Sequence, residues 1–330
     1  MKINIVCTQT PSPSANGYSI DLYYTILALR ENGFEIRTHI QVLDDDPLLL
    51  DELCQDDSPI LFEGLRACNL LTHPRLKERM KVVRLHHIAH DHYCRLAMLN
   101  KFTMRGFNYF IESLRCKRME RSLNQAQAVC AISKGDMQYW ESLLPDTKII
   151  HLPCLFDASF PENPLPTEPF VLYHGNLDND ESRYVIRLIA NDLAKRCPGI
   201  LFVIAGRRED EEEKELPQNV KIIPNPTDDH LQLLLATAGI HLLPSIQPTG
   251  IKTKLLTALV KGTGHIIANH EMLYGHSLGR FCLRADTPKD MAAGIQKLIT
   301  QPVDPKSLER RKQILLKQKK AGISRLSLFK

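Results

Sequence analysis

The sequence has no long hydrophobic segment. None of its apolar runs approaches the roughly 20 residues that a membrane-spanning helix needs, and the chain opens with a strand-like run at residues 3–6 instead of a signal peptide. We therefore expect a cytoplasmic protein. Neither a G-x-G-x-x-G fingerprint nor a Walker phosphate loop occurs, which argues against a dinucleotide-binding or P-loop protein.

Paired cysteines are also missing. The nine cysteines are scattered, and no two of them form a C-x-x-C pair. Cys7, Cys130 and Cys282 lie inside apolar runs, a position typical of buried free thiols in a reducing compartment. We expect no disulfide framework and no metal site.

The sequence lacks a broad excess of basic residues. The formal net charge is +4, yet residues 306–330 alone hold nine Lys or Arg against one Glu, which leaves the rest of the chain at −4. A nucleic-acid binder with an extended basic face is therefore not expected. We predict that the basic tail attracts the protein to anionic lipid at the inner membrane face.

What the sequence does contain is a regular alternation of strand-like and helix-like segments. The predicted strands are residues 3–8, 35–42, 59–63, 82–87, 128–133, 148–153, 170–175, 201–205, 220–224, 240–244, 265–268 and 281–284. The predicted helices lie near residues 18–31, 47–55, 66–80, 105–124, 135–143, 181–196, 229–238, 251–261 and 288–300. This alternation indicates an α/β protein with parallel strands and crossover helices.

A proline-rich stretch divides the chain. Five prolines fall between residues 153 and 169, a density that neither a helix nor a central strand tolerates. We expect two doubly wound Rossmann-like domains that face a cleft. The predicted parts are an N-terminal domain at 1–155, a linker at 156–169, a second domain at 170–303, and a basic C-terminal helix at 304–330.

In such sheets ligands bind beyond the carboxyl ends of the strands, so the loops there are the candidate sites. Gly17 closes the first of these loops and lets a phosphate or sugar approach the start of a helix; a simple Pro-Ser turn is the alternative. The fourth strand ends in RLHHIAHDHY, where His86 is expected to bind or orient a polar substrate. Because His86 and His90 are four apart and would share a helix face, a metal pair is the competing hypothesis.

Three loops of the second half carry the remaining candidates. Gly175 and Asn176 follow one strand, and Gly206 and Arg207 follow the next. An arginine at this edge of a sheet can reach a pyrophosphate.

The stretch PSIQPTGIKTKLLTALVKGTGHIIAN at 244–269 is the most informative. Gly250 allows a tight turn and close approach to a ligand, and the next helix opens with Lys252 and Lys254. Lysine in a first turn is unfavourable with the helix dipole, which favours a diphosphate site over two ordinary surface lysines. We expect both lysines to be exposed.

These residues resemble a known family, the retaining glycosyltransferases of family 4 with the GT-B fold. Residues 244–258 are similar to its motif P-S-x-x-E-G-F-G-x-x-x-x-E-A. The segments HGNL at 174–177 and IAGR at 204–207 fall where the family has its donor-facing loops. The segment RLHHIAHDHY resembles a stretch of bacterial members that build surface polysaccharides. The two motif glutamates, which in the family touch the donor sugar and the ribose hydroxyls, are Thr249 and Thr257 here.

The resemblance implies a hexosyltransferase that moves a sugar from a nucleotide-diphosphate sugar to a hydroxyl acceptor, a glycan or a lipid-linked glycan, with retention and without a cofactor or metal. Lys252, Lys254 and Arg207 would stabilise the departing diphosphate. The resemblance also implies that the domain at 1–155 binds the acceptor, that the domain at 170–303 binds the nucleotide sugar, and that the helix at 304–330 returns to the N-terminal domain. Two alternatives stay open: a sugar-nucleotide epimerase on the same fold, and a catalytically silent binding module, for which the two threonines are the best support.

Overall fold

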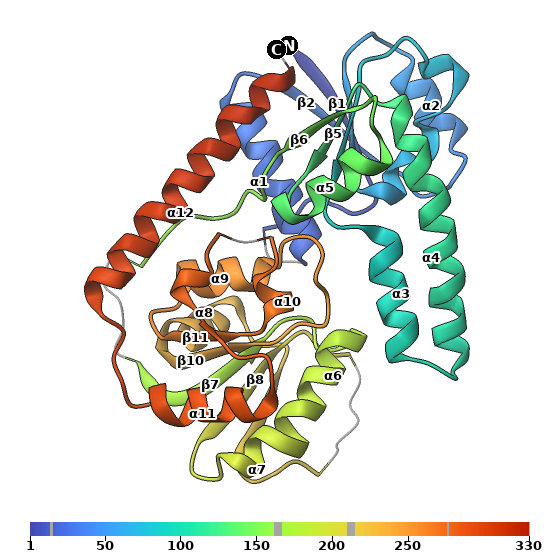
Figure 1. The fold of residues 1–330 in the computed structure, drawn as a ribbon. Coiled ribbons are helices and arrows are strands. Elements are labelled where there is room, and N and C mark those ends of the chain that lie inside the picture. Colours follow the sequence, from blue (N-terminus) through green and yellow to red (C-terminus); the bar gives the residue numbers. More distant parts are fainter. Residues whose placement is uncertain (14–15, 162–166, 210–214, 276, 330) are drawn as a thin grey trace. The chain divides into compact units, whose positions relative to one another are not determined.

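The computed structural model describes residues 1–330 except 14–15, 162–166, 210–214, 276 and 330. The chain divides into two compact units (Figure 1). Unit 1 holds residues 1–156, 249–251 and 318–330, and unit 2 holds residues 157–248 and 252–317. Each unit is an α/β unit built on its own parallel sheet of six strands, in agreement with the expected doubly wound architecture.

The sheet of unit 1 has the strand order β2-β1-β3-β4-β5-β6. Its strands are β1 (Lys2–Cys7), β2 (Glu35–Ile40), β3 (Ile60–Glu63), β4 (Lys81–Leu85), β5 (Ala128–Ala131) and β6 (Lys148–His151). Its helices are α1 (Gly17–Glu31), α2 (Pro47–Leu53), α3 (Ala89–Leu99), α4 (Met104–Ser122) and α5 (Lys134–Leu143). The order reverses between β1 and β3, which makes the carboxyl ends of these strands the topological switch point.

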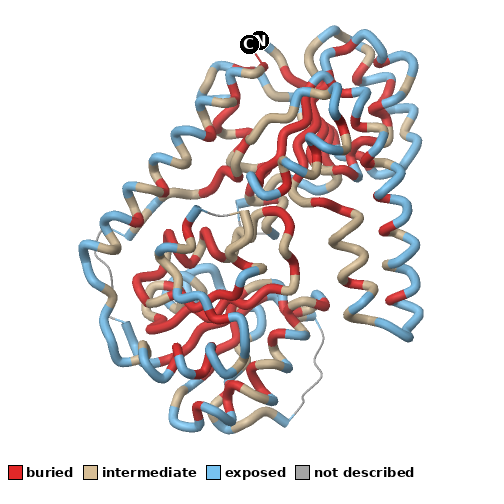
Figure 2. The backbone as a smooth tube through the Cα atoms, in the orientation of Figure 1, coloured by how far each residue is buried: buried red, intermediate tan, exposed pale blue. Residues whose placement is uncertain are grey.

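Alternating strand residues give the first sheet a core on each face. One core packs Val6, Phe62 and Val83 under α2, α4 and α5, and the other packs Ile5 and Leu61 under α1. The second core also takes in Leu326 and Phe329 from the short 3-10 helix Leu326–Phe329, which follows the C-terminal helix α12 (Pro305–Arg325). Figure 2 shows the buried strands at the centre of each unit.

The sheet of unit 2 has the order β12-β11-β10-β7-β8-β9, so its switch point lies between β10 and β7. Its strands are β7 (Glu168–His174), β8 (Leu201–Gly206), β9 (Val220–Pro224), β10 (Ala238–Leu243), β11 (His265–Ala268) and β12 (Leu283–Arg284). Its helices are α6 (Asp180–Leu188), α7 (Ala194–Arg196), α8 (Asp228–Thr237), α9 (Thr253–Lys261), α10 (His270–Leu273) and α11 (Pro288–Leu298). A π-helical turn at Ile189–Leu193 joins α6 to α7.

Two helix predictions were wrong. The helix expected near 66–80 is two short 3-10 helices, Leu65–Leu70 and Pro74–Leu76, because Pro74 cannot continue an α-helix. The helix α3 was not predicted, since its histidine-rich sequence was assigned to the end of a strand. All nine cysteines are free thiols; Cys7 and Cys130 are buried as expected, whereas Cys282 is only half-buried.

Candidate functional site

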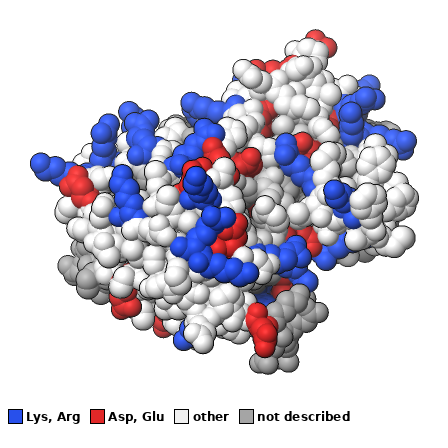
Figure 3. All heavy atoms as spheres, turned by 60° about the horizontal axis from the view of Figure 1, so that its bottom comes forward, with Lys and Arg blue, Asp and Glu red and all other residues white. Residues whose placement is uncertain are grey.

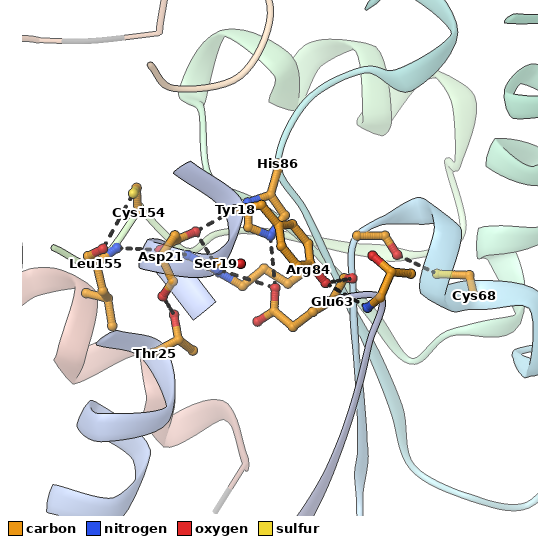
Figure 4. Close-up of polar contacts among 12 residues, drawn as sticks. Tyr18, Ser19, Asp21, Thr25, Glu63, Cys68, Arg84, His86, Cys154 and Leu155 are labelled. Carbon is orange, nitrogen blue, oxygen red and sulfur yellow. Dashed lines mark hydrogen bonds and ion pairs between the residues drawn. The ribbon is translucent and has the colours of Figure 1, made fainter. Parts of the chain in front are cut away.

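A buried ionic cluster lies at the switch point of unit 1 (Figure 4). Arg84 of β4 contacts Asp21 of α1 at 2.7 and 2.9 Å and Glu63 at the end of β3 at 3.4 Å. The backbone N–H of Leu155 donates a further bond to Asp21 at 2.8 Å. The three charged side chains are at most 1% exposed, so their mutual pairing must offset a large desolvation cost.

The protonation of this cluster follows from its contacts. Burial favours the neutral carboxyl of Asp21, but Arg84 and His86 together with the Leu155 N–H outweigh that effect, and the pKa of Asp21 is lowered. Burial likewise opposes the charge on Arg84, yet its two carboxylates raise the pKa of the guanidinium. Asp21 and Arg84 therefore stay ionised at neutral pH.

The side chain of His86, 12% exposed, reaches the same cluster from the loop after β4. Its Nε2 lies 3.1 Å from Glu63, its Nδ1 lies 3.4 Å from Asp21, and its ring stacks at 4.8 Å on Tyr18, whose hydroxyl donates to the Glu63 carbonyl at 2.8 Å. Carboxylates thus hold both edges of the imidazole. This anchoring fixes the ring in one orientation at the carboxyl end of the sheet.

The expectation that His86 and His90 share a helix face was wrong, because α3 begins at Ala89 and His86 precedes it. His90 belongs to another cluster, in which its Nδ1 contacts the buried Glu120 at 2.7 Å and Tyr139 donates to the same carboxylate at 2.7 Å. Among the residues that the structure describes, no group of three or more His, Cys, Asp or Glu is placed to hold a metal ion.

Residues 249–251 belong to unit 1 and pack against the loop that carries His86. Gly250 has φ +69°, its N–H donates to Asp136 at 2.9 Å, and a Cβ added there would lie 2.2 Å from the His86 carbonyl oxygen. The close approach for which glycine was expected is therefore made to the protein backbone. Thr249 beside it is 7% exposed.

The first loop of unit 1 ends in a defined helix cap. Asn16 accepts bonds from the N–H groups of Tyr18 and Ser19 at 3.1 and 3.2 Å, so Asn16 is the N-cap of α1. Gly17, the predicted ligand-approach residue, is the half-buried first residue of this helix. Ser14, another member of the loop, lies outside the described residues.

In unit 2 an ammonium group lies at the corresponding switch point. Lys254, in the first turn of α9, donates to the Tyr173 hydroxyl at 3.1 Å and lies 4.8 Å from the centre of that ring. Glu181 of α6 accepts from the Ser245 hydroxyl, and from the Ile246 N–H at 3.0 Å. The strand β7 and the loop that follows β10 thus both contribute to this cluster.

Lys254 and Glu181 influence each other's charge. Burial opposes the ammonium of Lys254, but Tyr173 and Glu181 outweigh it and its pKa is raised. Burial also opposes the carboxylate of Glu181, whereas Lys254, Ser245 and Lys252 lower its pKa. The expectation that Lys252 and Lys254 are exposed was wrong: both are half-buried, because these partners draw them in.

The other predicted residues of unit 2 lie at the same edge of the sheet or on α9. Gly206 needs to be glycine, since a Cβ would lie 1.7 Å from the Gly175 carbonyl, and a Cβ on Gly175 would lie 3.5 Å from the Lys254 ammonium. Asn176 accepts from the Asp178 N–H at 3.0 Å and so shapes its own loop. The exposed Arg207 pairs with Glu209, and Thr257 is half-buried on α9.

Sequence reasoning missed the residues that anchor these groups, namely Asp21, Glu63, Arg84, Tyr173 and Glu181. One signal was available: Glu63 and Arg84 lie within strands whose residues are all buried. Because a buried charge needs an opposite partner, an acidic and a basic residue on neighbouring strands predict an ion pair.

Comparisons with known proteins agree with the fold of the chain. Residues 168–301 match the family model of the glycosyl transferases group 1. No curated protein matches the chain. Solved structures with a similar fold include sucrose-phosphate synthase from Thermosynechococcus elongatus, at a TM-score of 0.75 and 12% identity over 99% of this chain and 98% of that one.

Two further structures hold nucleotide ligands. TarM of S. aureus, with UDP and alpha-GlcNAc-glycerol, has a TM-score of 0.60 at 15% identity over 83% of this chain. The chain spans about half of TarM, at 56% of its length. An E. coli trehalose-6-phosphate structure bound with UDP-2-fluoro glucose has a TM-score of 0.66 at 8% identity, over 100% and 99% of the two chains. These matches show the GT-B fold, and the family match supports a glycosyltransferase.

Proposed function

We propose that this protein transfers a hexosyl group from a nucleotide-diphosphate sugar to a hydroxyl acceptor, with retention of configuration. The observation that carries the proposal is the Lys254 ammonium, which Tyr173 and Glu181 hold at the switch point of the second sheet, at the start of α9. This point lies within the segment that matches the glycosyl transferases group 1. Bound UDP in two similar structures supports the choice of donor.

The donor half of the reaction belongs to unit 2. When the sugar–phosphate bond breaks, negative charge develops on the departing diphosphate, and groups fixed beforehand stabilise that charge best. Lys254 supplies an ammonium, and the first N–H groups of α9 add to it because the side chain of Lys252, the N-cap residue, makes no capping bond to them. The loops at Gly175 and Gly206 would lie along the nucleotide. Arg207 would leave its ion pair with Glu209 and bind a phosphate of the donor.

The acceptor half belongs to unit 1. His86 would contact the acceptor or the transferred sugar, with Glu63 and Asp21 as positioning residues that fix the plane of its ring. Gly17 would let a sugar approach the start of α1. No cofactor takes part in this scheme.

We propose a glycan or a lipid-linked glycan as the acceptor, in the synthesis of a bacterial surface polysaccharide. The resemblance of RLHHIAHDHY to that branch supports this choice. A peripheral contact of the basic tail with anionic lipid would bring the protein to such acceptors in the cytoplasm. Lys and Arg side chains are numerous on the face drawn in Figure 3, with acidic residues among them.

A catalytically silent nucleotide-sugar-binding module is the second candidate. Thr249 and Thr257 stand where the family motif has glutamates, and a threonine hydroxyl cannot supply a negative charge to the donor sugar. Glu181 is a carboxylate close to the same lysine, and this favours the active enzyme.

A thermal-shift titration with a panel of nucleoside diphosphates and their sugars tests the proposal. We expect one nucleotide series to raise the Tm, since a ligand that binds only the folded state stabilises it. Bound sugar nucleotide that is neither transferred nor cleaved would favour the silent module, and an epimerised donor without an acceptor would favour an epimerase. No shift with any member of the panel would contradict the proposal.

A further inference from the structure

In unit 1 the helices α3 and α4 form a hairpin (Figure 1), and the side chains at its tip are apolar and exposed. Phe102 is 99% exposed, Met104 75%, Met98 67% and Phe107 57%. Side chains of this size are normally buried, and four of them within ten residues form a patch of the kind that marks an interaction surface.

Hydrogen bonds of Thr103 fix the backbone of this tip. Thr103 donates to the Asn100 carbonyl at 2.7 Å and accepts from the Gly106 N–H at 3.0 Å, which caps α4. Phe102 has φ +66°, an unfavourable conformation for an aromatic residue. The turn therefore holds the Phe102 side chain outward in a strained backbone conformation, and burial of that side chain within the chain does not offset the strain.

The apolar surface continues along one side of α4. Its inner side is buried against the rest of unit 1 at Gly106, Ser113, Cys116 and Glu120. Its exposed apolar residues recur every three or four positions, which places them on one helix face. They are Met104, Phe107, Phe110, Ile111 and Leu114.

The charge around the tip is of one sign. Residues 92–111 hold three Lys or Arg and no Asp or Glu. The Lys101 ammonium lies 5.9 Å from the Phe102 ring centre and the Arg105 guanidinium 5.8 Å from that of Tyr109, so both cations flank the apolar side chains. An apolar crest with a basic rim is complementary to an anionic lipid surface, where the crest enters the acyl boundary and the cations meet headgroups.

We infer that the α3–α4 tip inserts into the interface of an anionic bilayer. A second copy of the chain is a poorer occupant, because its basic rim would repel this one. Among the described residues no helix is long and apolar enough to span a membrane, which makes the hairpin a peripheral anchor. The inference goes beyond the proposed function, since lipid binding does not depend on sugar transfer.

A tryptophan placed at the tip tests insertion directly. The chain has one tryptophan, Trp140, and it is 1% exposed, so Phe102→Trp adds a single solvent-facing reporter. With phosphatidylglycerol vesicles we expect its emission to shift to the blue and brominated acyl chains to quench it. Leu48→Trp, at a site 76% exposed on α2, is the matched control and should do neither.

Binding itself is measured by vesicle flotation at low and high salt. Phe102→Ser combined with Met104→Ser should lower the bound fraction at least tenfold, and Leu48→Ser should leave it unchanged. The double variant Lys317→Glu with Lys320→Glu, measured in the same flotation assay, reports the contribution of the basic tail to vesicle binding separately. An unquenched tryptophan at position 102, or a blue shift that grows with protein concentration without vesicles, would overturn the inference. Nucleotide binding is measured without lipid, so its result tests the proposed function independently of lipid binding.

Discussion

Replacing Lys254 with alanine removes the ammonium at the switch point of unit 2. A charge-assisted bond to a diphosphate contributes about 1–3 kcal/mol, so the affinity for a nucleoside diphosphate should fall roughly 5- to 150-fold. The same change affects stability. Lys254 is one of the groups that lower the pKa of Glu181, and its loss leaves that carboxylate with the Ser245 hydroxyl, the Ile246 N–H and the charge of Lys252. We expect a stability loss of about 1–3 kcal/mol.

Glu181→Gln separates the two effects. In the Lys254→Ala background the uncharged glutamine removes the uncompensated carboxylate, so part of the lost stability should return. Nucleotide affinity should not return, because the ammonium is still absent. Calorimetric titration with UDP, GDP and ADP gives the affinities, and urea unfolding gives the stabilities. Unchanged affinity of Lys254→Ala for every nucleotide, or recovery of affinity in the double variant, would refute the assignment of Lys254.

Three further outcomes follow from named contacts. His86→Ala should abolish transfer and leave nucleotide affinity within about twofold, since we assign the donor to the other unit; normal turnover would reduce His86 to a structural residue. Gly250→Ala should lower the Tm more than Gly33→Ala does, because both have positive φ but only the former meets a carbonyl oxygen, at 2.2 Å, whereas Gly33 has nothing within 4 Å; equal shifts would contradict this. Burial lowers the pKa of His174 and His241 to about 3 from 6.5. Below pH 6.5 the unfolded chain therefore binds more protons, and stability should fall by about 1.4 kcal/mol per pH unit per histidine until about pH 3. His241→Leu should remove one histidine's share of this slope in urea unfolding at pH 7, 5.5 and 4.5, and an unaltered slope would show that His241 is not buried and neutral.

Much of the fold could be predicted because apolar strands are a local signal. The twelve predicted strands correspond to β1–β12 with ends shifted by a few residues. The two failures came from segments whose local pattern was ambiguous. Pro74 interrupts a helical pattern, and α3 has His90 and His92 near its start, with two further histidines just before it, in place of a clear apolar stripe.

The candidate site was harder to predict because its anchors are far apart in the sequence. Asp21 and Arg84 are 63 positions apart, yet their side chains meet at 2.9 Å. The need for a glycine at position 250 could be predicted from the expected turn. That the His86 carbonyl lies next to this glycine could not be predicted, because the contact is tertiary and no local pattern encodes it.

The most direct test of the account is the release of nucleoside diphosphate from a panel of nucleotide sugars, followed by chromatography, for the natural chain and for Lys254→Ala. We predict release from one sugar nucleotide, stimulated by a glycan or lipid-linked acceptor and lost in the variant. Release that Lys254→Ala leaves unchanged, or none from any sugar nucleotide with any acceptor, would contradict it.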